Sequence, residues 1–568
     1  MQRNLTKLSE KDYDLVVVGG GIFGVCACWE AVMRGLSVAL LEKGDFSHAT
    51  SANHFKMAHG GIRYLQHGDI YRIRESSHER SALLRIAPHL VSPLPIVVPT
   101  YGHGLKGRAV LGTGMLIYDL LTMDRNKGLQ KGKKIPMGKF LSKDQMLELF
   151  PDIERKNLTG GAVFYDGQIY NPPRIAVSFL KSAAEKGLDS ANYVEVTGFL
   201  KNKDRIFGVS AKDRLSGNEL EVKGKMILNT SGPWAHRLLT KTLDLDVSPM
   251  PTFSRDLALV VNKEAKSDFG LALTTKTEDA DSILDRGGRH LFILPWRNYT
   301  LVGVWHKVFE HSPENIAVTE EDIEVLISEV NQIYPSMELS INDISMINTG
   351  LTLFGSMDKQ GKTKMSFGKR SRIIDHKNEH RLEGLLTLIG VRATTARGMA
   401  EKAIDLVFKK FGKNAPKSNT DRIPICGGDF DDLSKLLLDG YRHYGGMFEN
   451  DVIQHLVYNY GSRYTDITRY FKLDQMHTQK IDGSNVLKAE IVHAVREEMA
   501  QKLSDVVLRR TDLGTAGHPG ENALNTCAQI MAIELGWNEQ RMKKELDEVQ
   551  TTFQNLRNNV YYDSGVFK

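Results

Sequence analysis

Histidines and arginines with the chemistry to move a proton and hold an anion lie far apart along this chain of 568 residues. His54, His59 and His306 have side chains that titrate near neutrality, so each could accept a proton from a substrate. The arginines that could hold an anion by paired hydrogen bonds are Arg63, Arg370 or Arg372, and Arg392. A single histidine is more often structural than catalytic, so the elements that position these side chains must be considered.

A glycine-rich turn between a strand and a helix is the clearest of those elements. The β-branched run 14–18 is typical of a buried parallel strand, and Gly19-Gly20-Gly21-Ile22-Phe23-Gly24 after it satisfies G-x-G-x-x-G. Residues 25–34 are compatible with a helix, and a second strand, 37–41, ends at Glu42. This order predicts a dinucleotide site in which the turn approaches a pyrophosphate and Glu42 accepts hydrogen bonds from ribose hydroxyls.

Composition is that of an ordinary globular protein and excludes several functions. Charged residues make up 25% of the chain, hydrophobic residues 41%, and the net charge of +5 is mild, so we expect no nucleic-acid partner. The spacing of Cys26, Cys28, Cys426 and Cys527 completes no metal site, and none is predicted. The sequence has no apolar run near 18 residues and no apolar signal core in residues 1–12.

The segment after the second strand indicates which dinucleotide is bound. Residues 45–65 are polar and rich in hydroxyl groups, without helical or strand periodicity, as expected of a loop that wraps a cofactor. Within it, Lys56 and His59-Gly60-Gly61-Ile62-Arg63-Tyr64-Leu65 resemble the FAD-dependent glycerol-3-phosphate dehydrogenase family, whose members carry Lys and then His-Gly-Gly-Leu-Arg-Tyr-Leu. Residues 229–234, Asn-Thr-Ser-Gly-Pro-Trp, are similar to the family's Asn-Ala-Thr-Gly-Pro-Trp.

The resemblance implies FAD as the cofactor and assigns residues to it. Val196 would contact the adenine, and residues 388–401, similar to the family's Gly-Gly-Lys-Leu-Thr-Thr-Tyr-Arg, would point backbone amides at the flavin pyrimidine oxygen. The implied FAD-binding residues are Gly19, Gly21, Ile22, Phe23, Gly24, Glu42, Lys43, Thr50, Ser51, Lys56, Met57, His59, Gly60, Gly61, Val196, Ser231, Gly232, Trp234, Gly390, Arg392, Ala393, Thr394 and Thr395. The implied catalytic residues are His59, Arg63, Tyr64, His306, Arg370 and Arg392, with His59 favoured as base because a flavin-facing motif follows it.

The predicted substrate sheet departs from the family pattern. The family's Gly-Thr-Thr-Asp is replaced by Gly303-Val304-Trp305-His306, and its Gly-Val-Arg-Pro by Gly350-Leu351-Thr352-Leu353. A family histidine on an earlier strand is Ala258 here. Because losing one arginine contact with an anion costs about 1.5 to 3 kcal/mol, the expected substrate is glycerol 3-phosphate or a related anionic polyol or hydroxy acid.

The predicted fold is α/β, and α+β overall. It has a Rossmann-like FAD-binding domain, an antiparallel-sheet substrate domain and a C-terminal helical domain. The predicted bounds are 12–100, 155–245 and 384–412 for the FAD-binding domain, 101–154 for a basic and apolar insertion, 246–383 for the substrate domain and 417–568 for the helical domain. The proline-containing run 94–98 is predicted to form an edge strand.

The insertion allows two interpretations. Residues 110–121 are apolar and flanked by lysines and arginines, which is typical of a segment that lies in a bilayer interface; the alternative is a core helix followed by a lysine-rich loop. Membrane-dependent relatives reduce quinone, which favours peripheral attachment. We therefore expect a cytoplasmic protein, peripheral at the inner face of a membrane, with homodimer formation as a further hypothesis.

The predicted activity is oxidation of an alcohol carbon by FAD, with electrons passed to quinone or another acceptor. Three alternatives stay open at this point. An oxidase would return electrons to oxygen as peroxide, an amine-oxidising flavoprotein would produce ammonia or an aldehyde, and a non-catalytic member would bind FAD for structure.

Overall fold

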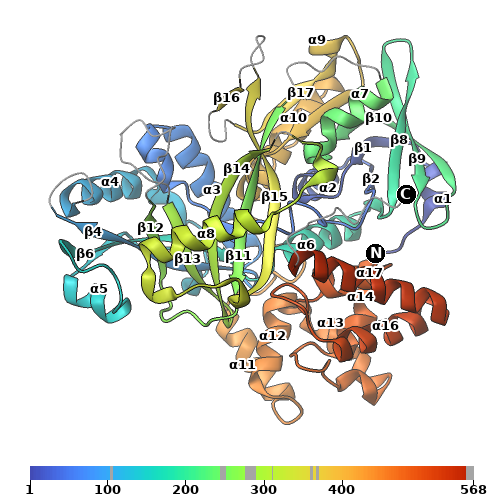
Figure 1. Ribbon diagram of the computed structural model, residues 1–568. Helices are drawn as coiled ribbons and strands as arrows, with labels where there is room; N and C mark the ends of the chain where they lie inside the picture. Colours follow the sequence, from blue (N-terminus) through green and yellow to red (C-terminus); the bar gives the residue numbers. More distant parts are fainter. Residues whose placement is uncertain are drawn as a thin grey trace.

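Two β-sheets and a group of C-terminal helices make up the fold (Figure 1). The computed structural model describes residues 1–102, 107–243, 251–275, 290–309, 311–357, 363–365 and 370–557. The predicted fold class is confirmed: a mixed α/β chain with a Rossmann-like sheet, a second, mainly antiparallel sheet and a helical C-terminal part. The two sheets provide the surfaces between which the site lies.

The first sheet is parallel at its centre. Its strands run in the order β17 (Arg372–Asp375), β18 (Leu385–Ile389), β10 (Glu219–Asn229), β1 (Tyr13–Val18), β2 (Val38–Leu41) and β7 (Asp189–Ala191). Both strands predicted around the glycine turn are confirmed, since β1 is parallel to β2 and to β10. The apolar run in β1 is explained by burial on both faces: Val17 packs against helices, whereas Val16 packs against the hairpin of β8 (Val194–Asn202) and β9 (Arg205–Asp213).

Three helices cover one face of this sheet. They are α2 (Ile22–Met33), α6 (Pro172–Glu185) and α10 (Ala396–Lys410), and α2 packs between the other two. Because α2 starts at the glycine turn and α10 starts after β18, both helix N-termini lie at the same edge of the sheet as the carboxyl ends of the parallel strands. This edge is where a nucleotide binds in open α/β sheets.

The second sheet is mostly antiparallel. Its strands run in the order β16 (Thr363–Met365), β15 (Ile344–Met357), β11 (Pro251–Val261), β14 (Tyr299–Phe309), β13 (His290–Trp296), β12 (Gly270–Thr274), β4 (Val91–Tyr101), β6 (Leu158–Ile169) and β3 (Met57–Ala58), with β5 (Lys139–Leu141) also paired to β6. The prediction of an edge strand at 94–98 is wrong, because β4 pairs with β12 on one side and β6 on the other. Strands β4 and β6, from ranges assigned to the FAD-binding domain, thus belong to the second sheet.

Helices pack on both faces of this sheet. α8 (Glu320–Ile333) packs on β11 and β14 through apolar side chains, and α3 (Ile70–Ile86), α4 (Arg108–Leu121) and α5 (Lys143–Leu149) lie near β4 and β6. α4 buries Met115 and Tyr118 but leaves Leu116 and Leu120 more than half exposed, so the interpretation of residues 110–121 as a core helix is wrong. Within the described ranges, no helix is both long and apolar enough to cross a membrane.

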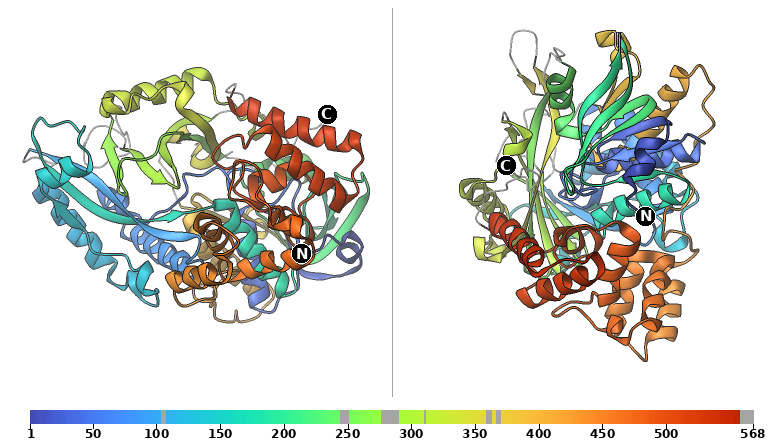
Figure 2. Two further views of the ribbon diagram at one scale, coloured as in Figure 1. Left: turned by 90° about the horizontal axis from the view of Figure 1, so that it is seen from below. Right: turned by 90° about the vertical axis from the view of Figure 1, so that its right-hand side faces the viewer.

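The C-terminal helices gather at one end of the molecule, below both sheets (Figures 1 and 2). They are α11 (Leu433–Tyr444), α12 (Asn450–Tyr460), α13 (Tyr464–Thr468), α14 (Lys488–Glu498), α15 (Leu503–Asp505), α16 (Glu521–Leu535) and α17 (Glu539–Arg557). Asp45, in the loop after β2, joins this part to the first sheet by fully buried bonds to Arg509 and Arg510. The helices therefore hold the cofactor-side loop in place rather than lining the site.

Candidate active site

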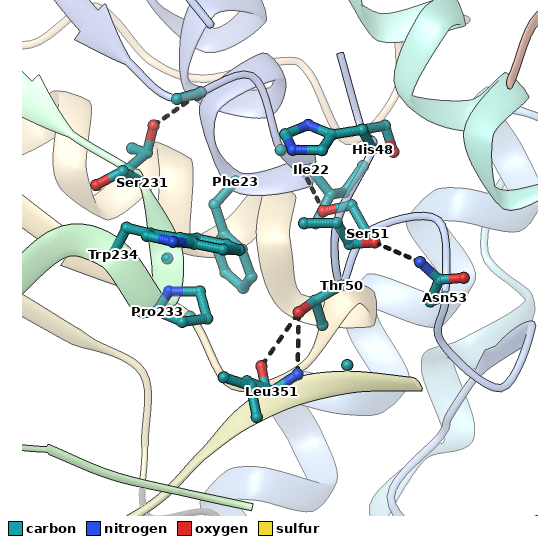
Figure 3. A pocket seen from close by; sticks show the side chains of 18 of the residues that line it. Ile22, Phe23, His48, Thr50, Ser51, Asn53, Ser231, Pro233, Trp234 and Leu351 are labelled. Carbon is teal, nitrogen blue, oxygen red and sulfur yellow. Dashed lines mark hydrogen bonds between the residues drawn. The ribbon is translucent and has the colours of Figure 1, made fainter. Parts of the chain in front are cut away.

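A cavity of about 470 Å³ lies between the two sheets (Figure 3). The ends of β1, β2 and β18 form its floor, and residues of β11, β14 and β15 form its roof. The loop 42–59 runs along its side, and Thr50 ties that loop to the roof through hydrogen bonds with the backbone of Leu351, at 3.3 Å to its oxygen and 3.1 Å to its nitrogen. The cavity has the size and the mixed apolar and polar lining of a cofactor site.

The glycine turn has the conformation that a phosphate-binding loop needs. Gly19 has φ +105°, which L side chains rarely adopt, and a Cβ on Gly24 would lie 1.9 Å from the Gly19 oxygen. Beside the turn, the Ile22 amide donates to Ser51 Oγ at 2.9 Å (Figure 3). As a result, the backbone of the turn stays uncovered by side chains at the start of α2. Unpaired amides and the helix dipole there favour binding of an anion.

Glu42 lies at the end of β2, as the sequence predicts. One carboxylate oxygen accepts from the Gly20 amide at 2.6 Å and the other from the Gly44 amide at 2.8 Å. Its side chain is buried and lines the cavity next to Lys43. A carboxylate fixed in this way can accept hydrogen bonds from ribose hydroxyls and repels a 2′-phosphate.

The adenine end of the cavity is formed by β8 and by α7 (Ala235–Leu243). Val196 lines the cavity there together with Leu238 of α7. The Lys43 ammonium lies 4.1 Å from the centroid of the Trp234 ring, which also faces the cavity. The position is suited to a flat aromatic base between apolar side chains.

The opposite end is bounded by the start of α10. Gly390 follows β18, and a Cβ there would lie 1.9 Å from the Phe23 ring, so a side chain would require that ring to move. The short helix before α10 (Ala393–Thr395) brings Thr394 to the cavity, and its hydroxyl accepts from the His59 amide at 3.1 Å. Backbone amides at this helix start can stabilise negative charge on a bound ring.

His59 is paired with a buried carboxylate that the sequence reasoning missed. Its Nδ1 lies 3.4 Å from Asp166 Oδ2, and the Gly60 amide donates to the other oxygen of Asp166. Arg80 donates to Asp166 at 3.0 Å and has no exposed side-chain surface. Burial alone would raise the pKa of Asp166, but the hydrogen bond from His59 and the charge of Arg80 hold it below its usual value. Asp166 lies in β6, 107 residues from His59 along the chain, so no spacing in the sequence links the two residues.

The other two histidine candidates have different surroundings. His54 lines the cavity, but burial and the charge of Lys56 lower its pKa to about 3, which makes it a weak base. His306 lies on β14 opposite Asp256 of β11 and does not line the cavity. His59, which does line it and has an orienting carboxylate, is the best placed of the three.

Most of the sequence-predicted FAD-binding residues line the cavity. Those that do so are Gly19, Gly21, Ile22, Phe23, Glu42, Lys43, Thr50, Ser51, Met57, His59, Val196, Ser231, Gly232, Trp234, Gly390, Arg392, Ala393 and Thr394. The structure places outside the lining Gly24, Lys56, Gly60, Gly61 and Thr395. Lys56 instead lies deep in the protein, with Nζ 3.0 Å from Asn348 Oδ1 and 4.7 Å from the Trp296 ring, and burial lowers its pKa to about 7.

The predicted arginines are only partly brought together. Arg392 lines the cavity and stacks on Tyr64, with 4.8 Å from guanidinium to ring centroid. Arg63 is exposed on the short helix Ile62–His67, and Arg370 is exposed and stacks on Tyr71. Of these three cations, Arg392 alone reaches the cavity.

The roof carries polar side chains that sequence reasoning did not select. Asp256 of β11 faces the cavity with Asn348 and Thr352 of β15. In each strand of the roof, every second side chain points into the cavity. The side chains between them pack on α8. The period-two pattern of 254–261 was the available signal, but the face turned to the cavity could not be known without the sheet order.

Fold and site together define a flavin-nucleotide oxidoreductase with a separate substrate sheet. The pattern of the FAD dependent oxidoreductase family (DAO) matches residues 14–389, and that of the C-terminal domain of alpha-glycerophosphate oxidase matches 418–542. A glycerol-3-phosphate dehydrogenase of Synechocystis is 30% identical over 96% of this chain and 97% of its own length, and a mitochondrial one of Mus musculus is 31% identical over 99% and 75%.

A solved structure has the same fold. The glycerol-3-phosphate dehydrogenase from Bacillus halodurans complexed with FAD is 22% identical, with a TM-score of 0.75 over 98% of this chain and 97% of its own. The chain therefore belongs to the FAD-dependent glycerol-3-phosphate dehydrogenase family of DAO-type oxidoreductases, and its cofactor is FAD. The resemblance inferred from the sequence is confirmed.

Proposed function

We propose that this chain oxidises the secondary alcohol of glycerol 3-phosphate or a related anionic polyol, and passes the electrons to quinone or another acceptor. The observation that carries the proposal is the cavity-lining His59, held by the buried carboxylate of Asp166 beside the flavin end of an FAD-shaped cradle. The curated relatives named above are glycerol-3-phosphate dehydrogenases, which supports the substrate class.

The described residues fit FAD on structural grounds. Side chains at Gly19, Gly24 and Gly390 would collide with neighbouring atoms, so the backbone stays open along the cavity. Glu42 and Lys43 lie where the ribose and adenine of a dinucleotide would bind. Bound flavin supplies the two-electron acceptor, and the protein supplies orientation and charge.

Proton removal is assigned to His59. When its Nδ1–H donates to Asp166, the other ring nitrogen is the basic one and can take the proton of a substrate hydroxyl. Asp166 fixes the tautomer and stabilises the imidazolium that forms, while Arg80 keeps the carboxylate ionised. The pair thus prepares the alcohol for loss of its hydrogen to the cofactor.

Recognition of the anionic group is assigned to Arg392. Its guanidinium is oriented by a hydrogen bond to Ser76 Oγ at 3.1 Å and by the Tyr64 ring. A planar guanidinium can bind phosphate or carboxylate with two parallel hydrogen bonds. Of the arginines that the sequence offered for the anion, Arg63 and Arg370 lie outside the cavity lining, which is why a related anionic polyol is kept beside glycerol 3-phosphate.

An anaerobic flavin-bleaching screen tests the proposal. Purified holoenzyme is mixed with glycerol 3-phosphate, other polyol phosphates and hydroxy acids, and the loss of the oxidised flavin absorbance near 450 nm is recorded. We expect bleaching by at least one anionic polyol. Bleaching by primary amines alone would contradict the proposal. In a separate aerobic assay, reoxidation by oxygen with stoichiometric peroxide as the main turnover route would also contradict it.

We further propose that α4 attaches the protein to the inner face of a membrane, where a quinone acceptor is available. Leu116, Ile117 and Leu120 of α4 are 56%, 43% and 59% exposed, and Met123 just beyond it is 74% exposed. Exposed lysines follow at 127, 131 and 134. An apolar patch rimmed by cations fits the interface of an anionic bilayer.

A further inference from the structure

Asp256 has a cavity-facing position in the middle of the roof. Its neighbours along β11 point the other way, because Arg255 pairs with Asp322 of α8 and Leu257 packs in the apolar cluster under α8. Directly opposite Asp256 on β15 stands Gly350, which has no side chain to cover the carboxyl group. Asp256 is therefore open toward the interior of the cavity.

The partners of Asp256 are hydroxyl groups. Ser254 Oγ donates to Oδ1 at 2.7 Å and Thr352 Oγ1 donates to Oδ2 at 2.8 Å. Throughout the residues that the structure describes, no lysine or arginine forms an ion pair with it, although Asp45, Asp166 and Asp322 each have an arginine. Burial raises the pKa of Asp256 to about 6.

A carboxylate in this setting can still accept hydrogen bonds. Its two oxygens offer about four lone-pair sites, and the two hydroxyls use two of them. A phosphate brought close would meet a second negative charge with no cation between them, which costs several-fold more in a cavity than in water. A hydroxyl donor at this position would instead gain a charge-assisted hydrogen bond.

We infer that Asp256 selects the uncharged end of the substrate: its carboxylate accepts a hydrogen bond from a hydroxyl of the polyol, and the anionic head binds at the Arg392 side of the cavity. The inference rests on the proposed function and names the residue that reads the hydroxyl end of that substrate. It also gives Thr352 a role, since its hydroxyl holds the carboxylate in place where the family pattern has an arginine.

Two substrates that differ by one hydroxyl test the inference. Glycerol 3-phosphate and propane-1,2-diol 1-phosphate share the phosphate and the secondary alcohol, but the second lacks the terminal hydroxyl. Anaerobic stopped-flow flavin reduction gives the Kd and limiting rate for each. For the wild type we expect the Kd of glycerol 3-phosphate to be 10- to 100-fold lower than that of propane-1,2-diol 1-phosphate. A hydrogen bond to a charged group provides a difference of this size.

The variants Asp256→Asn and Asp256→Ala should lose most of this preference. We expect the Kd ratio to fall about tenfold in Asp256→Asn and to approach one in Asp256→Ala, with the limiting rate for the diol ester within about threefold of wild type. Asp322→Asn is the matched control, because it removes a buried carboxylate of α8 that pairs with Arg255 on the other face of β11. It should lower stability but keep the ratio.

The outcomes separate the inference from the proposed function. An unchanged ratio in both Asp256 variants, in protein with full flavin content, overturns the inference while the alcohol oxidation stands. If neither ester bleaches the wild-type flavin but a primary amine does, both fall, and this is seen without any variant. Loss of the ratio in Asp322→Asn as well would also overturn the inference, because the effect would then come from the sheet as a whole.

Discussion

At the scale of single residues, His59 and Asp166 carry the proposed proton transfer. Replacing His59 with Gln removes the base but keeps a side chain of similar size. It also leaves in place the hydrogen bond that the Gly60 amide donates to Asp166. We expect the limiting rate of flavin reduction to fall by about 10² to 10⁴, with flavin content and the substrate Kd little changed. Stopped-flow absorbance measures all three. A rate within threefold of wild type would remove His59 from the mechanism.

The buried charge of Asp256 has a predictable cost in stability. Its folded-state pKa of about 6 lies above the unfolded value of 3.8, so the folded protein binds more protons and loses stability as pH rises from about 4 to 6. His306 of β14 stands opposite Asp256 in the register of the sheet. Asp256→Asn avoids the charge.

Asp256→Asn is therefore expected to stabilise the protein by on the order of 2 kcal/mol at pH 8 and by little at pH 4. The midpoint of thermal unfolding, followed by flavin fluorescence at both pH values, measures the difference. A variant less stable than wild type at pH 8 would show that the hydrogen bonds from Ser254 and Thr352 outweigh the cost of the charge.

At the scale of elements, α4 decides whether the protein meets a membrane. The double variant Leu116→Glu and Leu120→Glu places two charges on its exposed apolar face. We expect binding to vesicles with 30% phosphatidylglycerol to fall at least tenfold. The reason is that burying each leucine side chain in the interface contributes about 1.5 to 3 kcal/mol to the free energy of binding. Co-sedimentation at low salt measures the loss.

The matched control for α4 is Leu438→Glu. Leu438 is 51% exposed on α11, one of the C-terminal helices, and lies outside the α4 patch. This variant should bind vesicles like the wild type. Equal binding by wild type and the α4 variant would leave peripheral attachment without support.

At the scale of the whole molecule, one buried carboxylate couples the cofactor loop to the C-terminal helices. Asp45 accepts from Arg510 at 2.7 Å through both oxygens, from Arg509 Nε at 2.5 Å and from Asn192 at 3.0 Å. The two arginines hold the pKa of Asp45 below its usual value against the effect of burial.

Asp45→Asn should cost about 3 to 5 kcal/mol, because buried Arg510 loses its ion-pair partner and buried Arg509 keeps only Asp505. We expect the variant to lose FAD at lower temperature and to be cut faster by protease between the sheets and the helices. Glu449→Gln, which breaks the exposed pair with Lys480, is the control and should cost less than about 1 kcal/mol. Equal behaviour of the two variants would contradict the coupling.

The sequence by itself determined the FAD-binding half of this protein. The glycine turn, the strand run before it and Glu42 follow local rules: each needs a particular φ, a particular periodicity or a fixed distance along the chain, and the structure has each in its predicted place. The family motifs at 229–234 and 388–401 added the segments that return to the same sheet, and the motif at 59–65 added the segment around His59.

Tertiary structure alone decided which side chains meet around the cavity. His59 and Asp166 are 107 residues apart, and Asp256 and Thr352 are 96 apart, so no spacing in the chain links them. Strand order also placed β4 inside the second sheet and turned Asp256 rather than its neighbours toward the cavity. The physical reason is that cross-strand contacts depend on register and face, which are set by packing of the whole sheet.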